Sequence, residues 1–318
     1  MFIFGCATDT GARGGLTGDI LPITSDVSSD IDIVEPSTSD GIVSDVILPE
    51  DSENTANGDS SESIGDPECP PNMVYIPSGS FIMGDVEGNP DAKIQHEVTL
   101  DAYCIDIYEV SVAEYQKCAD ANACTDIREY ALCLSDAPDR PNSCQPDRKT
   151  HPVNYVSWNL ANQYCTWARK TLPTEAQWEQ AARGNDFRSY PWGETANCEI
   201  ANWGHGPVFD DCDYLGPTTP TMPVDSYPDG ASFYGVLNMG GNVDEWVSDW
   251  YDPKYYEVSP PRNPTGPTTG EWRVFRGGSF SGPNFVMLSY WRQAGLGPQI
   301  GSQNSGFRCA APPRLPAK

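Results

Sequence analysis

Hydrophobic and aromatic residues are distributed unevenly along the 318-residue chain. Residues 25–68 are mainly Ser, Asp, Thr, Glu, Gly and Pro with scattered Ile and Val, and contain no aromatic side chain. All nine tryptophans lie beyond residue 69. A segment this polar cannot bury enough apolar surface to offset its conformational entropy. We therefore predict a lipoprotein-type signal remnant and the start of a tether over 1–24, a disordered acidic linker over 25–68, and one globular domain over 69–318.

The domain begins with short apolar runs that predict β-strands. Met73–Ile76 and Ser80–Gly84 are separated by a Pro-x-Gly turn, which favours a β-hairpin between them. His96–Leu100, extended by Ala102 and Tyr103, predicts a further strand.

Three segments carry the start signals of helices. Ser111 and Glu114 form a capping box, followed by an apolar face of Val112, Tyr115, Cys118 and Ala119. Ser157 precedes a second helix, whose helically spaced residues are Trp158, Ala161, Tyr164, Cys165 and Ala168. Thr174 and Gln177 form another capping box, and Gly184 is placed to end that third helix.

The remaining segments are rich in Gly, Pro, Asn and Trp and show little periodicity. They predict an irregular α+β domain with little regular secondary structure. The chain has eleven cysteines and no CxxC pair, so a zinc site is disfavoured. Ten cysteines beyond residue 68 form an even set, which favours disulfides and an oxidising compartment.

Cys6 stands apart from this set. It follows Phe2-Ile3-Phe4-Gly5, which is typical of the end of a bacterial lipoprotein signal, and a polar tether follows it. Five residues are too few for a complete signal, so either the start is set too late or Cys6 is incidental. The first alternative predicts lipidation at Cys6, a place in the cell envelope, and a membrane contact through the lipid alone. No run of about 20 apolar residues predicts a membrane span.

The formal net charge of −26 argues against nucleic acid as a partner, because such binding requires Lys and Arg to neutralise phosphates.

Eight motifs follow one another along the domain. They are Ile76–Gly84 (IPSGSFIMG), Glu109–Tyr115 (EVSVAEY), His151–Trp158 (HPVNYVSW), Leu172–Gly184 (LPTEAQWEQAARG), Tyr190–Gly193 (YPWG), Tyr234–Trp246 (YGVLNMGGNVDEW), Arg276–Phe280 (RGGSF) and Gly306–Cys309 (GFRC). In this order they resemble the formylglycine-generating enzyme (sulfatase-modifying factor) family over nearly all of 69–313. The resemblance implies that family's α+β fold, which is related to C-type lectins.

The resemblance also implies one disulfide, between Cys165 and Cys309. Proximity then suggests Cys118–Cys124, Cys133–Cys144 and Cys198–Cys212, which leaves Cys69–Cys104. Sequence alone does not fix this connectivity.

The resemblance implies an oxidase that converts a sulfatase cysteine to formylglycine with copper held by two thiolates. Gly282 and Met287 stand where those cysteines would be, and no cysteine lies between Cys212 and Cys309. Copper is therefore not expected. Ser279 and Met287 remain weak catalytic candidates, with a turn hydroxyl and a core side chain as the favoured interpretations. The family aromatic before Glu-Trp is replaced by Asp244, and an arginine by Leu296, so the substrate site is altered as well.

Calcium is the metal that the sequence favours. It takes six to eight oxygen ligands, often from an irregular loop and a carboxylate. The resemblance implies one site at Asn238, Gly241, Val243 and Glu245. A second possible site matches Asn202 and Trp203 with an acidic residue, Asp213 or Asp211. The alternative is that Asn238 and Glu245 only cap turns.

A second catalytic branch of the resemblance, the iron-dependent sulfoxide synthases, needs three histidines. This chain has only His96, His151 and His205, for which packing or a loop position is favoured. We therefore expect an exported, calcium-stabilised module that binds an extracellular or periplasmic protein, peptide or glycan. The alternatives are a formylglycine-generating-type oxidoreductase acting on a protein cysteine through a reworked site, and a purely structural envelope protein.

Overall fold

The computed structural model describes residues 68–129, 133, 140–204 and 221–314. The predicted lipidation site Cys6 and residues 1–67 lie outside this part. The α-helices are α1 (Val112–Asp120), α2 (Trp158–Trp167) and α3 (Glu175–Arg183). The strands are β1 (Met73–Ile76), β2 (Gly79–Met83), β3 (His96–Leu100), β4 (Tyr103–Asp106), β5 (Asp244–Trp250), β6 (Arg273–Arg276), β7 (Gln293–Ala294), β8 (Ser305–Gly306) and β9 (Ala310–Ala311). Short 3-10 helices lie between them: η1 (Ile127–Glu129), η3 (Asn142–Cys144), η5 (Pro228–Gly230), η6 (Tyr255–Glu257) and η7 (Asn284–Met287).

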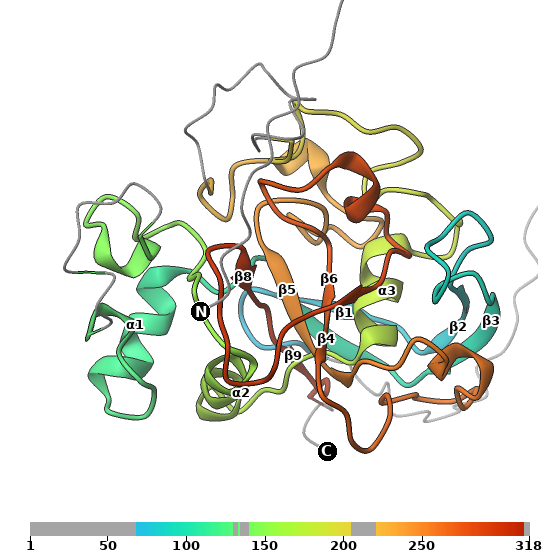
Figure 1. Cartoon of the computed structure of the whole chain (residues 1–318), viewed down its shortest axis with the longest axis horizontal. Helices are drawn as coiled ribbons and strands as arrows, with labels where there is room; N and C mark the ends of the chain where they lie inside the picture. Colours follow the sequence, from blue (N-terminus) through green and yellow to red (C-terminus); the bar gives the residue numbers. More distant parts are fainter. Residues whose placement is uncertain (1–67, 130–132, 134–139, 205–220, 315–318) are drawn as a thin grey trace, which may run out of the picture. The chain divides into compact units, whose positions relative to one another are not determined.

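The strands form three small sheets, in the orders β1-β4-β9, β2-β3 and β7-β6-β5-β8 (Figure 1). The predicted hairpin between β1 and β2 is therefore wrong: β1 pairs with β4 and β2 pairs with β3. Alternation in the sequence indicates which face of a strand is buried, but it does not identify the partner strand. The predicted single strand from His96 to Tyr103 is also divided, because Asp101 leaves the ladder and accepts from the Asn263 side-chain amide.

The three predicted helices are confirmed together with their caps. Both capping boxes are formed, and Ser157 accepts a hydrogen bond from the Leu160 backbone at the start of α2. The predicted apolar face of α1 is buried. Gly184 ends α3 with a positive φ of 69°, a conformation that glycine adopts without steric cost. Among the described residues, no helix is long and apolar enough to cross a bilayer.

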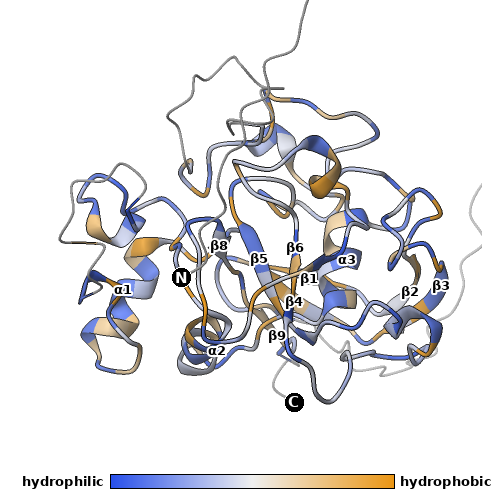
Figure 2. Cartoon of the chain, in the orientation of Figure 1, coloured by the Kyte–Doolittle hydropathy of each residue, from blue (hydrophilic) through white to orange (hydrophobic). Residues whose placement is uncertain are grey.

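Two adjacent apolar clusters make the main core. One packs strands β1 to β4 against Ala176, Trp178 and Ala181 of α3. The other surrounds α2 and includes Trp246 of β5, which stacks on Phe275 of β6 at 3.8 Å between ring centroids. β5 is coloured largely as hydrophilic in Figure 2, although it lies between β6 and β8. The fold is thus α+β with little regular structure, as the sequence predicts.

Disulfides brace this irregular fold. Four of the expected pairs are formed: Cys69–Cys104, Cys118–Cys124, Cys133–Cys144 and Cys165–Cys309. Cys198 is also disulfide-bonded, and its expected partner Cys212 lies outside the described residues. Every described cysteine is therefore in a disulfide.

The Cys165–Cys309 bridge should stabilise the domain more than any local bridge. It joins residues 144 apart, whereas Cys118–Cys124 joins residues only 6 apart. In the chain-entropy account, the double serine variants lose about 5 and about 2 kcal/mol, respectively. Denaturant unfolding of the two variants tests this order. Equal losses would show that loop length does not set the contribution.

Asp249 caps α3 from a neighbouring strand and predicts a pH dependence. Its carboxylate accepts from the Glu175 backbone N–H at 2.9 Å, and burial, followed by the Glu175 carboxylate, raises the pKa of Asp249 to about 7. In the unfolded chain the pKa of Asp249 is about 4. Between pH 4 and pH 7 the folded state therefore binds more protons at Asp249 than the unfolded state does, and the free energy of unfolding falls as the pH rises across this range.

Asp249→Asn should remove this component of the pH dependence. From pH 4 to pH 8 the wild type should lose up to about 4 kcal/mol of unfolding free energy that the variant does not lose. The control is Asp229→Asn, at an exposed aspartate. A difference that does not change with pH would contradict the raised pKa.

Candidate functional site

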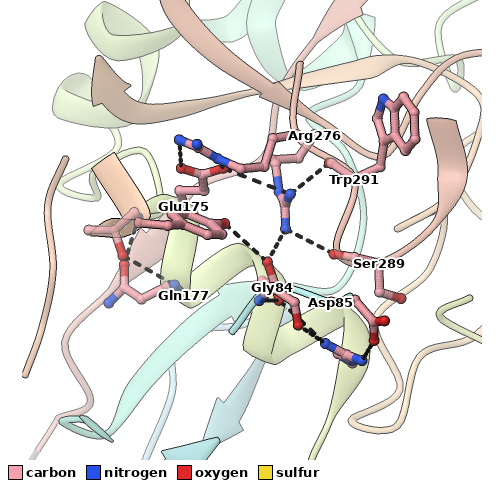
Figure 3. Close-up of polar contacts among 12 residues, drawn as sticks. Gly84, Asp85, Glu175, Gln177, Arg276, Ser289 and Trp291 are labelled. Carbon is pink, nitrogen blue, oxygen red and sulfur yellow. Dashed lines mark hydrogen bonds and ion pairs between the residues drawn. The ribbon is translucent and has the colours of Figure 1, made fainter. Parts of the chain in front are cut away.

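A network of buried ion pairs fixes the position of the candidate site (Figure 3). Glu175 of α3 accepts two hydrogen bonds from Arg292, at 2.7 and 3.0 Å. Glu179, one turn later, accepts from Arg276 of β6 at 2.5 Å and from the Gly84 backbone N–H at 2.8 Å. Both glutamates and both arginines are, as whole residues, at most 1% exposed. Helix α3 is thereby joined to β6 and to the segment that precedes β7.

The predicted calcium loop lies beside a further buried ion pair. Glu245 of β5 accepts from Arg308 at 2.6 and 2.7 Å, and from the Trp178 indole at 2.9 Å. Arg308 also donates to the backbone carbonyl of Leu237 at 2.7 Å, one residue before the loop. The carboxylate of Glu245 is therefore fixed in position. Its Oε2 accepts two of these bonds, whereas its Oε1 accepts one and can take a further contact.

Glu109 is a second buried carboxylate at this loop. It is 0% exposed, and its Oε2 accepts from the side-chain amides of Asn238 at 3.0 Å and Asn242 at 2.9 Å. Its Oε1 has no hydrogen-bond partner among the described residues. Burial, and then the charge of Glu245, raises the pKa of Glu109 to about 8 despite the opposing charge of Arg308.

The backbone of the loop turns sharply where the sequence predicts ligands. Asn238, Gly241 and Asn242 have positive φ angles of 54°, 92° and 63°. A Cβ at Gly241 would lie 2.4 Å from the Asn202 carbonyl oxygen, so this position requires glycine. Among the described residues, no three His, Cys, Asp or Glu side chains form a metal-binding group. A calcium site does not require such a group, because backbone carbonyl and side-chain amide oxygens also serve as calcium ligands. The residues present fit such an ion: Glu109 and Glu245 are two buried carboxylates, an oxygen of Glu109 has no hydrogen-bond partner among the described residues, and the loop backbone turns sharply beside them.

The second expected calcium site is only partly described. Asn202 and Trp203 are buried, at 0% and 4% exposed. The Asn202 side chain donates to Asn242 at 3.2 Å, which connects it to the first loop. Asp213 and Asp211 lie outside the described residues.

Neither residue at the positions expected for the copper thiolates is a cysteine: they are Gly282 and Met287. Met287 is 0% exposed and packs with Tyr190, Ala201 and Trp203. A Cβ at Gly282 would lie 2.7 Å from Cγ2 of Val286, so a larger residue there requires Val286 to move. Met287 is thus a core side chain.

Ser279 and Asp244 are brought together at the start of β5. Ser279 is 3% exposed, and its side chain is hydrogen-bonded to Asp244. The Gln293 amide donates to Asp244 at 3.2 Å. Burial raises the pKa of Asp244 to about 7, and these two bonds oppose the rise.

The two described histidines belong to no metal-binding group of three His, Cys, Asp or Glu side chains among the described residues. His151 lies beside Thr221 at 3.0 Å, and burial lowers its pKa to about 4. His96 packs edge-on against Tyr256 at 4.8 Å between ring centroids. His205 lies outside the described residues.

Sequence reasoning missed Glu109 as a member of the site. Its motif, EVSVAEY, contributes to the family resemblance and predicts the helix that follows, but it gives Glu109 no role. An acidic residue flanked by apolar neighbours, here Tyr108 and Val110, is the sequence signal that could have identified it.

Loss of the Glu245 carboxylate should leave Arg308 as a buried, unpaired charge. We expect Glu245→Gln to lower the free energy of unfolding by about 3–5 kcal/mol. Asp101→Asn, which breaks the exposed pair with Arg262, should cost at most about 1 kcal/mol. Denaturant unfolding measures both, and a similar small loss in both variants would contradict the assigned role of Glu245.

Comparisons with known proteins agree with this architecture. Residues 61–312 match the sulfatase-modifying factor enzyme 1-like domain family. The formylglycine-generating enzyme of Bos taurus is 35% identical over 303 residues, with 80% of this chain and 79% of that protein covered. The formylglycine-generating enzyme of Thermomonospora curvata is 35% identical over 294 residues, covering 76% and 93%. The structure of PvdO from Pseudomonas aeruginosa shares the fold, with a TM-score of 0.61 at 24% identity over 76% of this chain and 94% of PvdO. The chain belongs to the sulfatase-modifying factor enzyme 1-like (formylglycine-generating enzyme-like) family.

Proposed function

We propose that this chain is an exported module that keeps the family scaffold and a calcium ion, lacks copper-thiolate oxidase chemistry, and binds a protein, peptide or glycan. One observation carries the proposal. By the resemblance, Gly282 and Met287 stand where the two copper thiolates would be, and every described cysteine is in a disulfide. Soft thiolate ligands are what a Cu(I) site of this kind requires.

Calcium would be held by the side-chain oxygens of Asn238 and Glu245 and by the carbonyls of Gly241 and Val243. Its positive charge would join a turning loop to a buried carboxylate and offset the excess negative charge of Glu109 and Glu245 over Arg308. The role of the ion is structural in this proposal. It holds the end of the loop from which β5 begins.

Export is supported by the disulfides, because such bonds persist in oxidising compartments. Cys6 within an apolar opening sequence supports a lipid anchor in the cell envelope. The acidic segment 25–68 would then act as a tether between the membrane surface and the domain.

A second candidate function is an oxidoreductase acting on a protein cysteine through a reworked site. The 35% identity to named formylglycine-generating enzymes favours it. Such an enzyme must hold copper or iron and consume oxygen, whereas the binding module holds calcium alone.

Metal analysis of the purified chain separates these functions. After dialysis with calcium and copper, the binding module should retain one or two equivalents of calcium and no redox metal by mass spectrometry. Stoichiometric copper or iron, together with oxygen uptake in the presence of thiol peptides, would overturn the proposal in favour of the oxidoreductase.

Asn238→Gly should weaken calcium binding at least about tenfold, because it removes one oxygen ligand while glycine keeps the positive φ. Asn122→Gly is the matched control, since Asn122 has the same φ of 54° and is exposed. Calorimetric titration measures both variants. Equal affinity in the two variants would contradict the site, as would the absence of any calcium-dependent rise in the melting temperature of the wild type.

A further inference from the structure

Strand β2 has one paired edge and one open edge. It pairs antiparallel with β3 and, within the described part of the chain, with no other strand. In such a pair, the backbone groups of successive residues point alternately toward the partner strand and away from it. Thr99 of β3 points away, because its N–H donates to the Pro261 carbonyl and its carbonyl accepts from the Asn263 N–H. Ser80 lies directly opposite Thr99, so the backbone groups of Ser80 point away from β3 on the other side.

Helix α3 covers only one end of this open edge. The alternation that begins at Ser80 continues through Ile82 to Gly84. The Gly84 N–H donates to Glu179 of α3, and its carbonyl accepts from Arg183. In Figure 1, β2 accordingly lies between β3 and α3. The backbone groups of Ser80 and Ile82 have no hydrogen-bond partner among the residues that the structure describes.

A groove of about 190 Å³ adjoins these unpaired backbone groups. It is lined by Ser80 and Ile82 of β2, and by Asn185 and Phe187, which follow α3. Ser80 and Asn185 are exposed, Ile82 is half-buried, and Phe187 is 55% exposed. Phe187 therefore gives the groove an apolar wall, and the space beside the open edge is accessible from solvent.

The groove also contains a carboxylate without a cation. Glu97 of β3 lies in register with Ile82, lines the groove and is exposed. It forms no ion pair with any residue that the structure describes. Arg183 is the cation among the described lining residues, and it is already paired with Asp85. The groove thus offers an unpaired negative charge beside an apolar wall.

We propose that the open edge of β2 binds an extended peptide segment of a partner protein, which adds a strand to the β2-β3 sheet. Ser80 and Ile82 each present one donor and one acceptor, at the two-residue spacing of an extended backbone. An apolar side chain of the peptide contacts Phe187, and a lysine or arginine pairs with Glu97.

This inference deepens the proposed binding function by naming its ligand class, and it rests on that function. A glycan lacks a regular row of backbone N–H and carbonyl groups, so the open edge favours a peptide over a glycan. The net charge of −26 also favours the approach of a basic segment.

Amide hydrogen exchange of the full chain tests the inference directly. The probe is the blocked peptide acetyl-Thr-Val-Lys-Val-Thr-amide, and the control is the same peptide with every residue N-methylated. At about ten times its Kd, the probe should slow exchange of the Ser80 and Ile82 amides about tenfold. The methylated peptide should not, because it has lost its N–H donors and its methyl groups prevent strand pairing. Failure of the probe to slow either amide, or equal protection by the methylated peptide, overturns the inference.

A second copy of the chain is the other occupant that this edge could take. It would make exchange of the Ser80 and Ile82 amides slow without peptide, and slower as the chain concentration rises. Sedimentation would then show a dimer over the same concentration range. That result overturns the inference, whereas fast exchange in a monomeric chain is the expected result.

Ser80→Pro removes one outward N–H and leaves the ladder between β2 and β3 unchanged. It should weaken binding of the probe at least about fivefold in calorimetric titration. Ser80→Ala is the matched control, because it loses the hydroxyl but keeps the N–H, and it should bind like the wild type. Equal affinity in the two variants would count against the open edge as the site. If Ser80→Pro does not fold, the methylated peptide on the wild type still decides.

Glu97→Gln tests the predicted basic residue. It should weaken the lysine probe about two- to fivefold, because an exposed ion pair contributes little. It should leave unchanged the affinity for the same peptide with norleucine in place of lysine. Equal effects on the two peptides would show that Glu97 does not pair with the ligand, and would overturn the preference for a basic segment.

Failure of this inference differs from failure of the proposed function. A chain that retains calcium without redox metal, but whose Ser80 and Ile82 amides the probe does not protect, keeps the proposed function and loses the inference. A chain that retains stoichiometric copper or iron loses the proposed function, whatever the peptides show.

Discussion

Four buried arginines hold this domain together, because they supply hydrogen bonds that its short strands cannot. Arg183, Arg276, Arg292 and Arg308 are at most 2% exposed, and each donates to at least one backbone carbonyl of an irregular segment. Buried carbonyls require donors, and a guanidinium group offers five in a fixed plane. Each arginine also needs a buried carboxylate, since an unpaired buried charge costs several kcal/mol. Loops, helix α3 and the central sheet therefore depend on one another through these pairs.

This dependence explains where the sequence motifs lie. Glu175, Glu179 and Arg183 belong to the LPTEAQWEQAARG motif, Arg276 to RGGSF and Arg308 to GFRC. In the structure these charged residues are core residues that tie segments together. Charged residues in short motifs usually suggest catalysis, but here their burial and mutual pairing assign them to the scaffold. The side chains of these motifs that point away from the buried ion pairs are the ones available to form a binding site.

The sequence predicts local structure well and long-range partners poorly. Capping boxes at Ser111 and Thr174 depend on residues three positions apart, so the helices they begin are readable from the chain. The pairing of β1 with β4 depends on a contact about 30 residues away, and the turn at Pro77 suggested a nearer partner. The ordered motifs located the loop around Asn238, but the role of Glu109 became visible only when folding placed it beside that loop. The registers that bring Gln293 to Asp244 likewise have no local signal.

The two faces of the central sheet allow the chemistry of the site to change without loss of the fold. Glu245 and Arg276 maintain the core from one face, and a substitution at the neighbouring position 244 acts on the other. The resemblance implies an aromatic residue in place of Asp244 and two thiolates in place of Gly282 and Met287, and the arginine–carboxylate pairs are intact beside these positions. Met287 fills an apolar cluster, whereas Asp244 places a carboxyl group at the start of β5. The chemistry of these positions can thus change without disturbing the ion pairs on which the fold depends.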